Sequence, residues 1–283
     1  MKCSLFKTIE KRKRTMMTPR VAAIHDMSGF GRCSLTVAIP ILSAMGVQCC
    51  PLPTAFLSTH TGGFEGFTFL DMTDEMSKVA DHWASLGLTF QAVYSGFLGS
   101  ERQIGVVENF ICRFRGPDTV VVVDPVMGDY GRVYQTYTAA MCSGMARLAE
   151  LADVITPNLT AGEAGLREIT ERLSLGGRRS VVLTGASLAP GRTGAVCFDA
   201  RTGKTEAVQT AYVAHEFHGT GDVFSSVLTG ALVRGESLSS AAGEAAAFVR
   251  ACAERTAAED LPMREGVDFE PLLGLLIPGK ETV

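Results

Sequence analysis

The strongest constraint on the fold is residues 119–123, an uninterrupted apolar run made of one threonine and four valines. Such a run is typical of a strand whose two faces are both buried, as in a parallel sheet covered by helices. Similar runs alternate with segments of helical periodicity along most of the chain, which predicts one α/β domain with a mostly parallel central sheet and helices on both faces. The predicted strands are 21–25, 47–57, 92–97, 119–123, 153–156 and 180–184, with a hairpin at 194–198 and 206–213. The predicted helices are 33–45, 71–86, 101–114, 134–151, 161–173, 222–234 and 238–256.

Composition narrows the class of protein. The chain has 283 residues, of which 46% are hydrophobic, and a formal net charge of −4, so it is a globular protein with no electrostatic reason to bind nucleic acid. No apolar run approaches the roughly 20 residues that cross a bilayer. The eight cysteines include no CxxC pair, which favours free thiols in a reducing, cytoplasmic setting over a disulfide framework or a zinc site.

The two ends of the chain differ from the rest. Residues 1–19 carry a basic run at 11–14 with no apolar segment behind it, so we expect a disordered extension rather than a secretory signal. Residues 20–261 hold the predicted domain. Residues 262–283 include an apolar patch at 272–277, and we expect this tail to pack on the domain or to be partly disordered.

The carboxyl ends of the predicted strands, where open α/β sheets bind their ligands, carry mostly polar or glycine residues. They are Asp26, Gly96-Phe97, Asp124, Thr156-Pro157-Asn158 and Thr184-Gly185. Two familiar nucleotide motifs are missing. There is no GxxxxGK[ST] loop, and the turn at residues 29–34 has Ser34 where a dinucleotide fingerprint has its third glycine.

The most specific motif is Gly219-Thr220-Gly221-Asp222, a glycine turn at the start of a predicted helix. Backbone N–H groups at a helix start attract anions such as phosphate, and a carboxylate in the same turn could accept a proton from a hydroxyl group. The alternative is that Asp222 only caps the helix.

Asp124 and Asp129 form a second motif, because they bracket a turn that follows the valine-rich strand. Two carboxylates there suit Mg²⁺, although an ordinary Asp-Pro turn has the same pattern. Asn158 could likewise be a helix cap, and His60 could be a solvated loop histidine.

Together and in this order, these segments resemble the ribokinase-like family, and more closely the bacterial branch of the pyridoxal (vitamin B6) kinases. The resemblance covers residues from about 21 to the last helix. It implies that Asp222 is the catalytic base and that Gly219, Thr220 and Gly221 form an anion hole. It also implies contacts of Asp26, His60, Thr61 and Phe97 with the vitamer, and of Asn158, Thr184 and Thr220 with ATP.

The same resemblance implies that Asp124, Asp129 and Thr156 serve metal ions. Mg²⁺ and ATP would be required, a monovalent cation (K⁺ or Na⁺) would lie near Asp124, Thr156 and Thr184, and the enzyme would be a homodimer. The implied reaction is phosphorylation of the 5′-hydroxymethyl group of pyridoxal, pyridoxine or pyridoxamine.

One position departs from the family pattern. The glutamate of the family's NxxE segment, which helps to hold Mg²⁺, is replaced by Ala161. Glu163 would lie roughly 200° further around a helix and should not substitute for it. Two alternatives therefore stay open: a hydroxymethylpyrimidine kinase of the same fold, and a non-catalytic protein that binds B6 vitamers.

Overall fold

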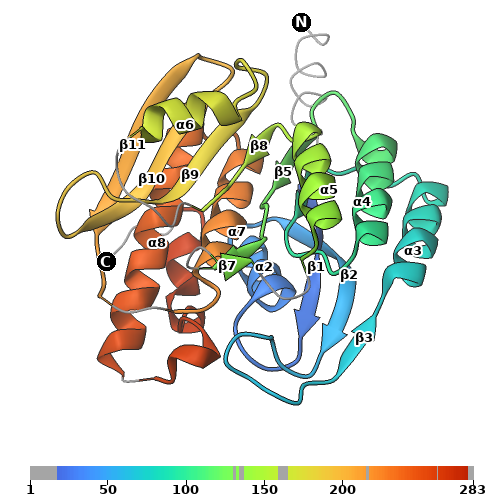
Figure 1. The fold of residues 1–283 in the computed structure, drawn as a ribbon, viewed down its shortest axis with the longest axis horizontal. Coiled ribbons are helices and arrows are strands. Elements are labelled where there is room, and N and C mark those ends of the chain that lie inside the picture. Colours follow the sequence, from blue (N-terminus) through green and yellow to red (C-terminus); the bar gives the residue numbers. More distant parts are fainter. Residues whose placement is uncertain are drawn as a thin grey trace, which may run out of the picture.

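A nine-stranded sheet forms the centre of the computed structural model, which describes residues 18–129, 132–133, 137–158, 165–214, 217–259 and 261–279. The spatial order of the strands is β11 (Lys204–Ala211), β10 (Arg192–Asp199), β9 (Ser180–Ala186), β8 (Val154–Ile155), β5 (Val120–Val123), β4 (Ala92–Ser95), β1 (Arg20–Ser28), β2 (Gln48–Leu57) and β3 (Phe69–Asp71) (Figure 1). A separate two-stranded ribbon pairs β6 (Gly128–Asp129) with β7 (Arg132–Val133).

The six central strands are parallel, from β9 through β8, β5, β4 and β1 to β2. The two edges are antiparallel: β10 and β11 form a hairpin next to β9, and β3 pairs with β2. The chain leaves β1 toward β2 on one side and then returns to β4 on the other. This reversal of strand order is the place where open α/β sheets bind ligands, at the carboxyl ends of the strands.

Helices cover both faces of the sheet, as Figure 1 shows. The helices are α2 (Ser34–Ala44), α3 (Thr73–Ser85), α4 (Glu101–Phe114), α5 (Ala139–Glu150), α6 (Leu166–Leu173), α7 (Thr220–Val233) and α8 (Leu238–Ala258), followed by two 3₁₀ turns, η1 (Met263–Glu265) and η2 (Glu270–Leu276). Residues of α2, α7 and α8 share one core with Val122, and residues of α3, α4 and α5 share the other with Val121 and Val123. The alternation of neighbouring valines between two cores explains why the whole run must be apolar.

The structure confirms the predicted fold class and most element positions. Helix α4 has the predicted bounds because Ser100 accepts a hydrogen bond from the Gln103 N–H and so caps it. The helix predicted at 134–151 begins only at Ala139, because Thr138 is its N-cap and its side chain accepts a hydrogen bond from the Met141 N–H. The helix predicted at 161–173 begins at Leu166, after Gly165 with its left-handed φ of +88°, and residues 159–164 lie outside the described ranges. The short strands β3, β6 and β7 were not predicted, because two or three residues are too few to show a period.

Residues 261–279 lie against the rest of the domain. Val267, Phe269 and Leu276 belong to the same core as α2, α7 and α8. The cysteines in the described part of the chain are all free thiols. In the same residues, no helix combines the length and the apolar character needed to cross a membrane.

Candidate active site

A cavity of about 570 Å³ opens at the carboxyl ends of the parallel strands. Residues from β1, from the segments that follow β2, β4, β5 and β8, from β9 to β11, and from α7 and α8 line it. Almost every predicted site residue is among them, namely Asp26, His60, Thr61, Phe97, Asp124, Thr156, Asn158, Thr184, Gly219, Thr220, Gly221 and Asp222. The exception is Asp129, whose side chain lies outside what the structure describes.

The Gly219–Asp222 turn begins α7. Gly219 has a φ of +76°, and a Cβ atom there would lie 2.1 Å from the Arg32 carbonyl oxygen, so only glycine fits. The Val223 N–H donates the first intrahelical hydrogen bond to the Gly219 carbonyl, and the amides of Thr220 and Gly221 therefore precede the helical hydrogen-bond pattern. Because these residues line the cavity, the start of α7 presents an anion-attracting helix terminus to it.

Asp124 is buried beside two hydroxyl groups. Ser225 Oγ donates to Asp124 Oδ2 at 3.0 Å and lies 3.2 Å from Thr156 Oγ1. Burial raises the pKa of Asp124 to about 7, and the hydrogen bonds from Ser225 and Thr156 oppose this shift. Sequence reasoning missed Ser225. Its spacing of one helical turn from Asp222, which puts both on one face of α7, was the available signal.

Asp26 is a second buried carboxylate in the cavity wall. Ser34 Oγ donates to its Oδ1 at 2.6 Å, and Ser28 Oγ donates to its Oδ2 at 3.2 Å. Burial raises the pKa of Asp26, while these hydrogen bonds lower it. Ser34 has a φ of +51°, a conformation that favours glycine, so the position that interrupts the glycine fingerprint is held in a strained conformation that orients its hydroxyl onto Asp26.

Cys33 also lines the cavity. Burial raises the pKa of its thiol, and the charges of Asp26 and Asp222 raise it further. Asp26, Cys33 and Asp222 all line the same cavity, although Asp26 and Asp222 are far apart in sequence. Asp26 therefore lies close enough to the Asp222 turn for one small molecule to contact both.

The loop after β2 carries His60, which is buried. Its Nε2 lies 2.6 Å from the Arg264 carbonyl oxygen, and the Gly62 N–H donates to its Nδ1 at 3.1 Å. Burial lowers the pKa of His60, the hydrogen bond to Arg264 raises it, and His218 lowers it. Both ring nitrogens are thus bound to the protein's own backbone, which leaves Thr61 as the hydrogen-bonding side chain of this loop at the cavity.

The opposite end of the cavity is built differently. Asn158 forms a β-bridge with Thr184, whose N–H and hydroxyl both contact the Pro157 carbonyl, at 2.9 and 3.2 Å. The remaining wall was not predicted, because no motif marks it. It consists of Thr193 and Gly194 of β10, Thr210 and Ala211 of β11, Tyr212 and Val213 beyond it, and Ala246, Val249, Arg250 and Ala253 of α8.

The predicted metal site has two of its three residues in contact through Ser225, namely Asp124 and Thr156. In the ranges that the structure describes, no three His, Cys, Asp or Glu side chains come together as a metal site. Ala161 and Glu163 lie outside those ranges. The oxygen donors present suit a hard cation that also takes ligands from phosphate.

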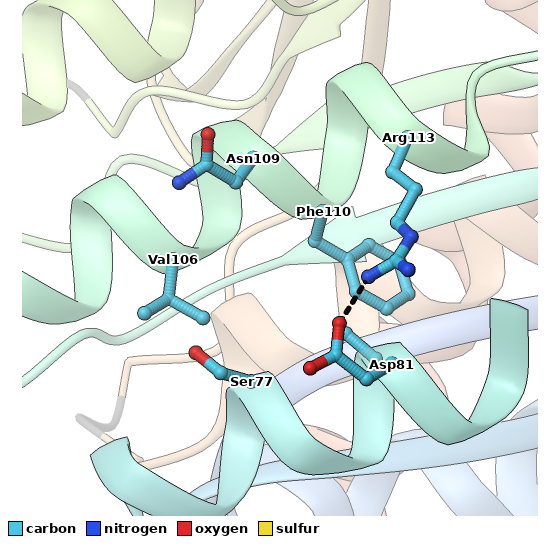
Figure 2. Close-up of a pocket in the computed structure, with 7 residues that line it drawn as sticks. Ser77, Asp81, Val106, Asn109, Phe110 and Arg113 are labelled. Atoms are coloured by element: carbon cyan, nitrogen blue, oxygen red, sulfur yellow. Dashed lines mark hydrogen bonds and ion pairs between the residues drawn. The ribbon is translucent and has the colours of Figure 1, made fainter.

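A second, smaller hollow of about 200 Å³ lies between α3 and α4 (Figure 2). Ser77, Val106, Asn109 and Phe110 line it, and an ion pair between Arg113 and Asp81 closes one side. None of the motif residues reaches this hollow. The cavity at the strand ends is therefore the candidate active site.

Comparison with known proteins agrees with this assignment. Residues 39–266 match the phosphomethylpyrimidine kinase family. A pyridoxine/pyridoxal/pyridoxamine kinase of Bordetella bronchiseptica is 29% identical over 265 residues, which cover 83% of this chain and 89% of the relative. A Bacteroides thetaiotaomicron protein assigned to the phosphomethylpyrimidine kinases, in a crystal form with pyridoxal, is 42% identical with a TM-score of 0.86, over 92% of this chain and 96% of that one.

The pyridoxal kinase of Lactobacillus plantarum is 27% identical, with a TM-score of 0.84 over 92% of this chain and 96% of that chain. The family match runs from within α2 to the end of η1 and includes α7. The fold is thus shared with a known pyridoxal kinase. This chain belongs to the phosphomethylpyrimidine kinase family, and its fold is the ribokinase-like fold of the pyridoxal kinases that its motifs resemble.

Proposed function

We propose that this enzyme transfers the γ-phosphate of ATP to the 5′-hydroxymethyl group of a B6 vitamer. The observation that carries the proposal is that Asp26, the His60–Gly62 loop, the Gly219–Asp222 turn and Asp124 all line one cavity. A carboxylate and an anion-binding helix start in the middle of a cavity suit transfer of a phosphoryl group between two bound molecules. The B. thetaiotaomicron relative with pyridoxal supports a vitamer as the acceptor.

In this mechanism the vitamer ring lies between Phe97 and the Thr61–Gly62 backbone, with Asp26 beside its polar substituents. The 5′-hydroxyl group then faces Asp222, which accepts its proton as the new bond to phosphorus forms. The amides of Thr220 and Gly221 stabilise the negative charge on the transferring group. Positioning and electrostatics supply most of the rate, as expected for phosphoryl transfer.

ATP occupies the other end of the cavity. Asn158 and Thr184 lie beside its phosphates, and the small side chains of α8 leave room for the base. Asp124, Thr156 and Asp129 are the residues that would hold metal ions, and Mg²⁺ bound with ATP would supply positive charge at the transferring phosphate. A buried carboxylate whose described partners are hydroxyl groups fits this role, and it also fits a monovalent cation.

The test is phosphate transfer from Mg-ATP to pyridoxal by the wild type and by Asp222→Asn. The variant keeps the size of the side chain but cannot accept a proton, so we expect turnover to fall by about 10²–10⁴-fold while pyridoxal still binds. Pyridoxal phosphate can be followed by its absorbance and pyridoxal binding by calorimetry. Normal turnover in Asp222→Asn would exclude the base role.

Ala161→Glu tests the departure from the family pattern. A gain in turnover would mean that the missing carboxylate limits metal binding. If the wild type shows no turnover and Ala161→Glu does, the protein is a disabled kinase that is kept for vitamer binding. If neither protein transfers phosphate to pyridoxal, pyridoxal is the wrong acceptor.

Hydroxymethylpyrimidine is the second candidate acceptor, because the family that the chain matches is the phosphomethylpyrimidine kinases. Turnover of pyridoxal, pyridoxine, pyridoxamine and hydroxymethylpyrimidine under the same conditions separates the two possibilities. A higher kcat/KM for the pyrimidine would replace the proposed substrate but leave the site assignment unchanged.

We also propose that the enzyme is a homodimer. Phe56 of β2 and Leu70 of β3 are cross-strand neighbours at the edge of the sheet, and both side chains are exposed, at 45% and 59%. A second copy of the chain is the proposed cover for this apolar edge, since an unprotected edge strand is prone to pairing. Sedimentation of the wild type should give a dimer, and Leu70→Asp should shift it toward monomer. A monomeric wild type would exclude the assignment.

A further inference from the structure

The C-terminal clasp, residues 262–269, contacts the loop that carries His60 although about 200 residues separate them in sequence. The tautomer of His60 follows from its two partners. Nδ1 accepts from the Gly62 N–H, so it carries no proton, and Nε2 faces the Arg264 carbonyl, so it must carry one. A single neutral tautomer is compatible with both contacts, and the clasp supplies the acceptor that selects it.

Aromatic packing joins the same two segments. The Phe64 ring meets the His60 ring edge to face at a centroid distance of 5.0 Å and the Phe30 ring at 5.8 Å. The Arg264 guanidinium group lies over Phe64, 5.2 Å from the ring centre, which adds a cation–π contact. The clasp therefore holds the loop at two points, the imidazole and the following aromatic side chain.

Asp268 fixes the clasp to the domain. Its carboxylate binds Arg32 at 2.9 Å and Arg255 at 2.7 Å, and its N–H donates to Thr256 Oγ1 at 2.8 Å. Asp268 is buried, so the two ion pairs are weakly screened. Loss of the carboxylate would remove this partner of Arg255, while Arg32 would keep its ion pair with Glu270.

Arg32 connects the clasp to the catalytic turn. Its N–H donates to the Glu265 carbonyl at 3.0 Å, and its own carbonyl packs against Gly219 so closely that a Cβ atom would lie 2.1 Å away. The clasp thus touches the His60 loop directly and the Gly219–Asp222 turn through one residue. Displacing it would change the position of the loop relative to the turn.

We propose that the clasp is the element that positions the acceptor-binding loop against the catalytic turn, with Asp268 as its positioning residue and the Arg264 carbonyl as the group that sets the His60 tautomer. This inference rests on the proposed function for the identity of the acceptor. It assigns a role to a tail whose sequence carries no motif. It also explains why His60, with both ring nitrogens committed to the backbone, acts on the loop rather than on the acceptor.

The experiment compares Asp268→Asn with Asp81→Asn, which removes an exposed aspartate–arginine pair in the hollow between α3 and α4, away from the candidate active site (Figure 2). In Asp268→Asn we expect the KM for pyridoxal to rise about tenfold while the KM for ATP changes less than twofold. Asp81→Asn should leave both constants unchanged. Asp268→Glu, which restores the charge, should recover part of the affinity. An unchanged pyridoxal KM in a folded Asp268→Asn protein would overturn the proposal.

A second readout does not depend on turnover. Nitrogen-15 NMR of the His60 ring should show one Nε2-protonated species in the wild type and exchange between tautomers in Asp268→Asn. A single Nε2-protonated species in both proteins would overturn the inference, whether or not the protein phosphorylates pyridoxal. Pyridoxal binding measured by calorimetry serves the same purpose if the wild type has no kinase activity. If Asp268→Asn does not fold, Arg255→Gln removes one of the two ion pairs and is measured in its place.

Discussion

The two halves of the cavity are held together in different ways. The half that we propose for the vitamer, called the vitamer half, lies around Asp26 and His60. It depends on a hydrogen bond from nearby Ser34 and on contacts of the distant residues Arg264 and Asp268. The half that we propose for ATP, called the nucleotide half, is lined mostly by small or apolar side chains of the β10–β11 hairpin and α8. In the first half a substitution acts through polar contacts over long sequence distances, and in the second it acts mainly through the space that it fills.

The largest expected effect belongs to a titratable group beneath the vitamer half. His25 is fully buried against the Tyr94 ring, and a Cβ atom on Gly96, next to Phe97, would lie 2.2 Å from its Nδ1. Burial lowers the pKa of His25 to about 3, from an ordinary value of about 6.5. The unfolded chain therefore binds the proton first as the pH falls, and the free energy of unfolding decreases below about pH 6.5.

The change is about 1.4 kcal/mol per pH unit between pH 6.5 and 3, up to about 4–5 kcal/mol. His25→Gln removes this titration, so the wild type should lose stability relative to the variant as the pH is lowered. Urea unfolding of both proteins from pH 8 to pH 4 measures the difference. If the free energy of unfolding falls equally with pH in both proteins, His25 does not set the acid stability. The vitamer half would then lack the pH-dependent stability that distinguishes it from the nucleotide half.

A smaller effect is expected in the nucleotide half. Val249→Trp places a large ring against the cavity from α8, so the KM for ATP should rise about tenfold, equivalent to about 1.4 kcal/mol. The KM for pyridoxal should stay within twofold, and Val249→Leu should have little effect on either constant. An equal rise in both constants would show that the two halves do not respond independently.

The clasp variant and Val249→Trp form a reciprocal pair. Asp268→Asn is expected to act on pyridoxal alone and Val249→Trp on ATP alone. Between them lies Asp222, whose loss should reduce turnover without a preference for either ligand. This pattern would locate the boundary between the halves at the start of α7.

Features marked by a long apolar run or a multi-residue motif could be predicted from the sequence, whereas features that depend on a single common residue could not. Long apolar runs and the GTGD turn identified the sheet, the helices and nearly the full set of strand-end residues. Ser225 and Ser34 were missed as partners of Asp124 and Asp26, since a serine near a motif has no distinctive pattern until the partner is located. The α8 wall was missed for the same reason, because alanine and valine on a helix also describe an ordinary core.

By itself, the sequence determined that the chain forms a helix-covered parallel sheet with its reactive residues at the strand ends. Periodicity and glycine turns are local properties that each segment carries alone. The tertiary structure alone decided the tautomer of His60, the contact of Asp268 with two arginines, and the position of the tail against the catalytic turn. Those features depend on groups that meet only after residues far apart in the chain are packed together, and burial then sets their charge and proton states.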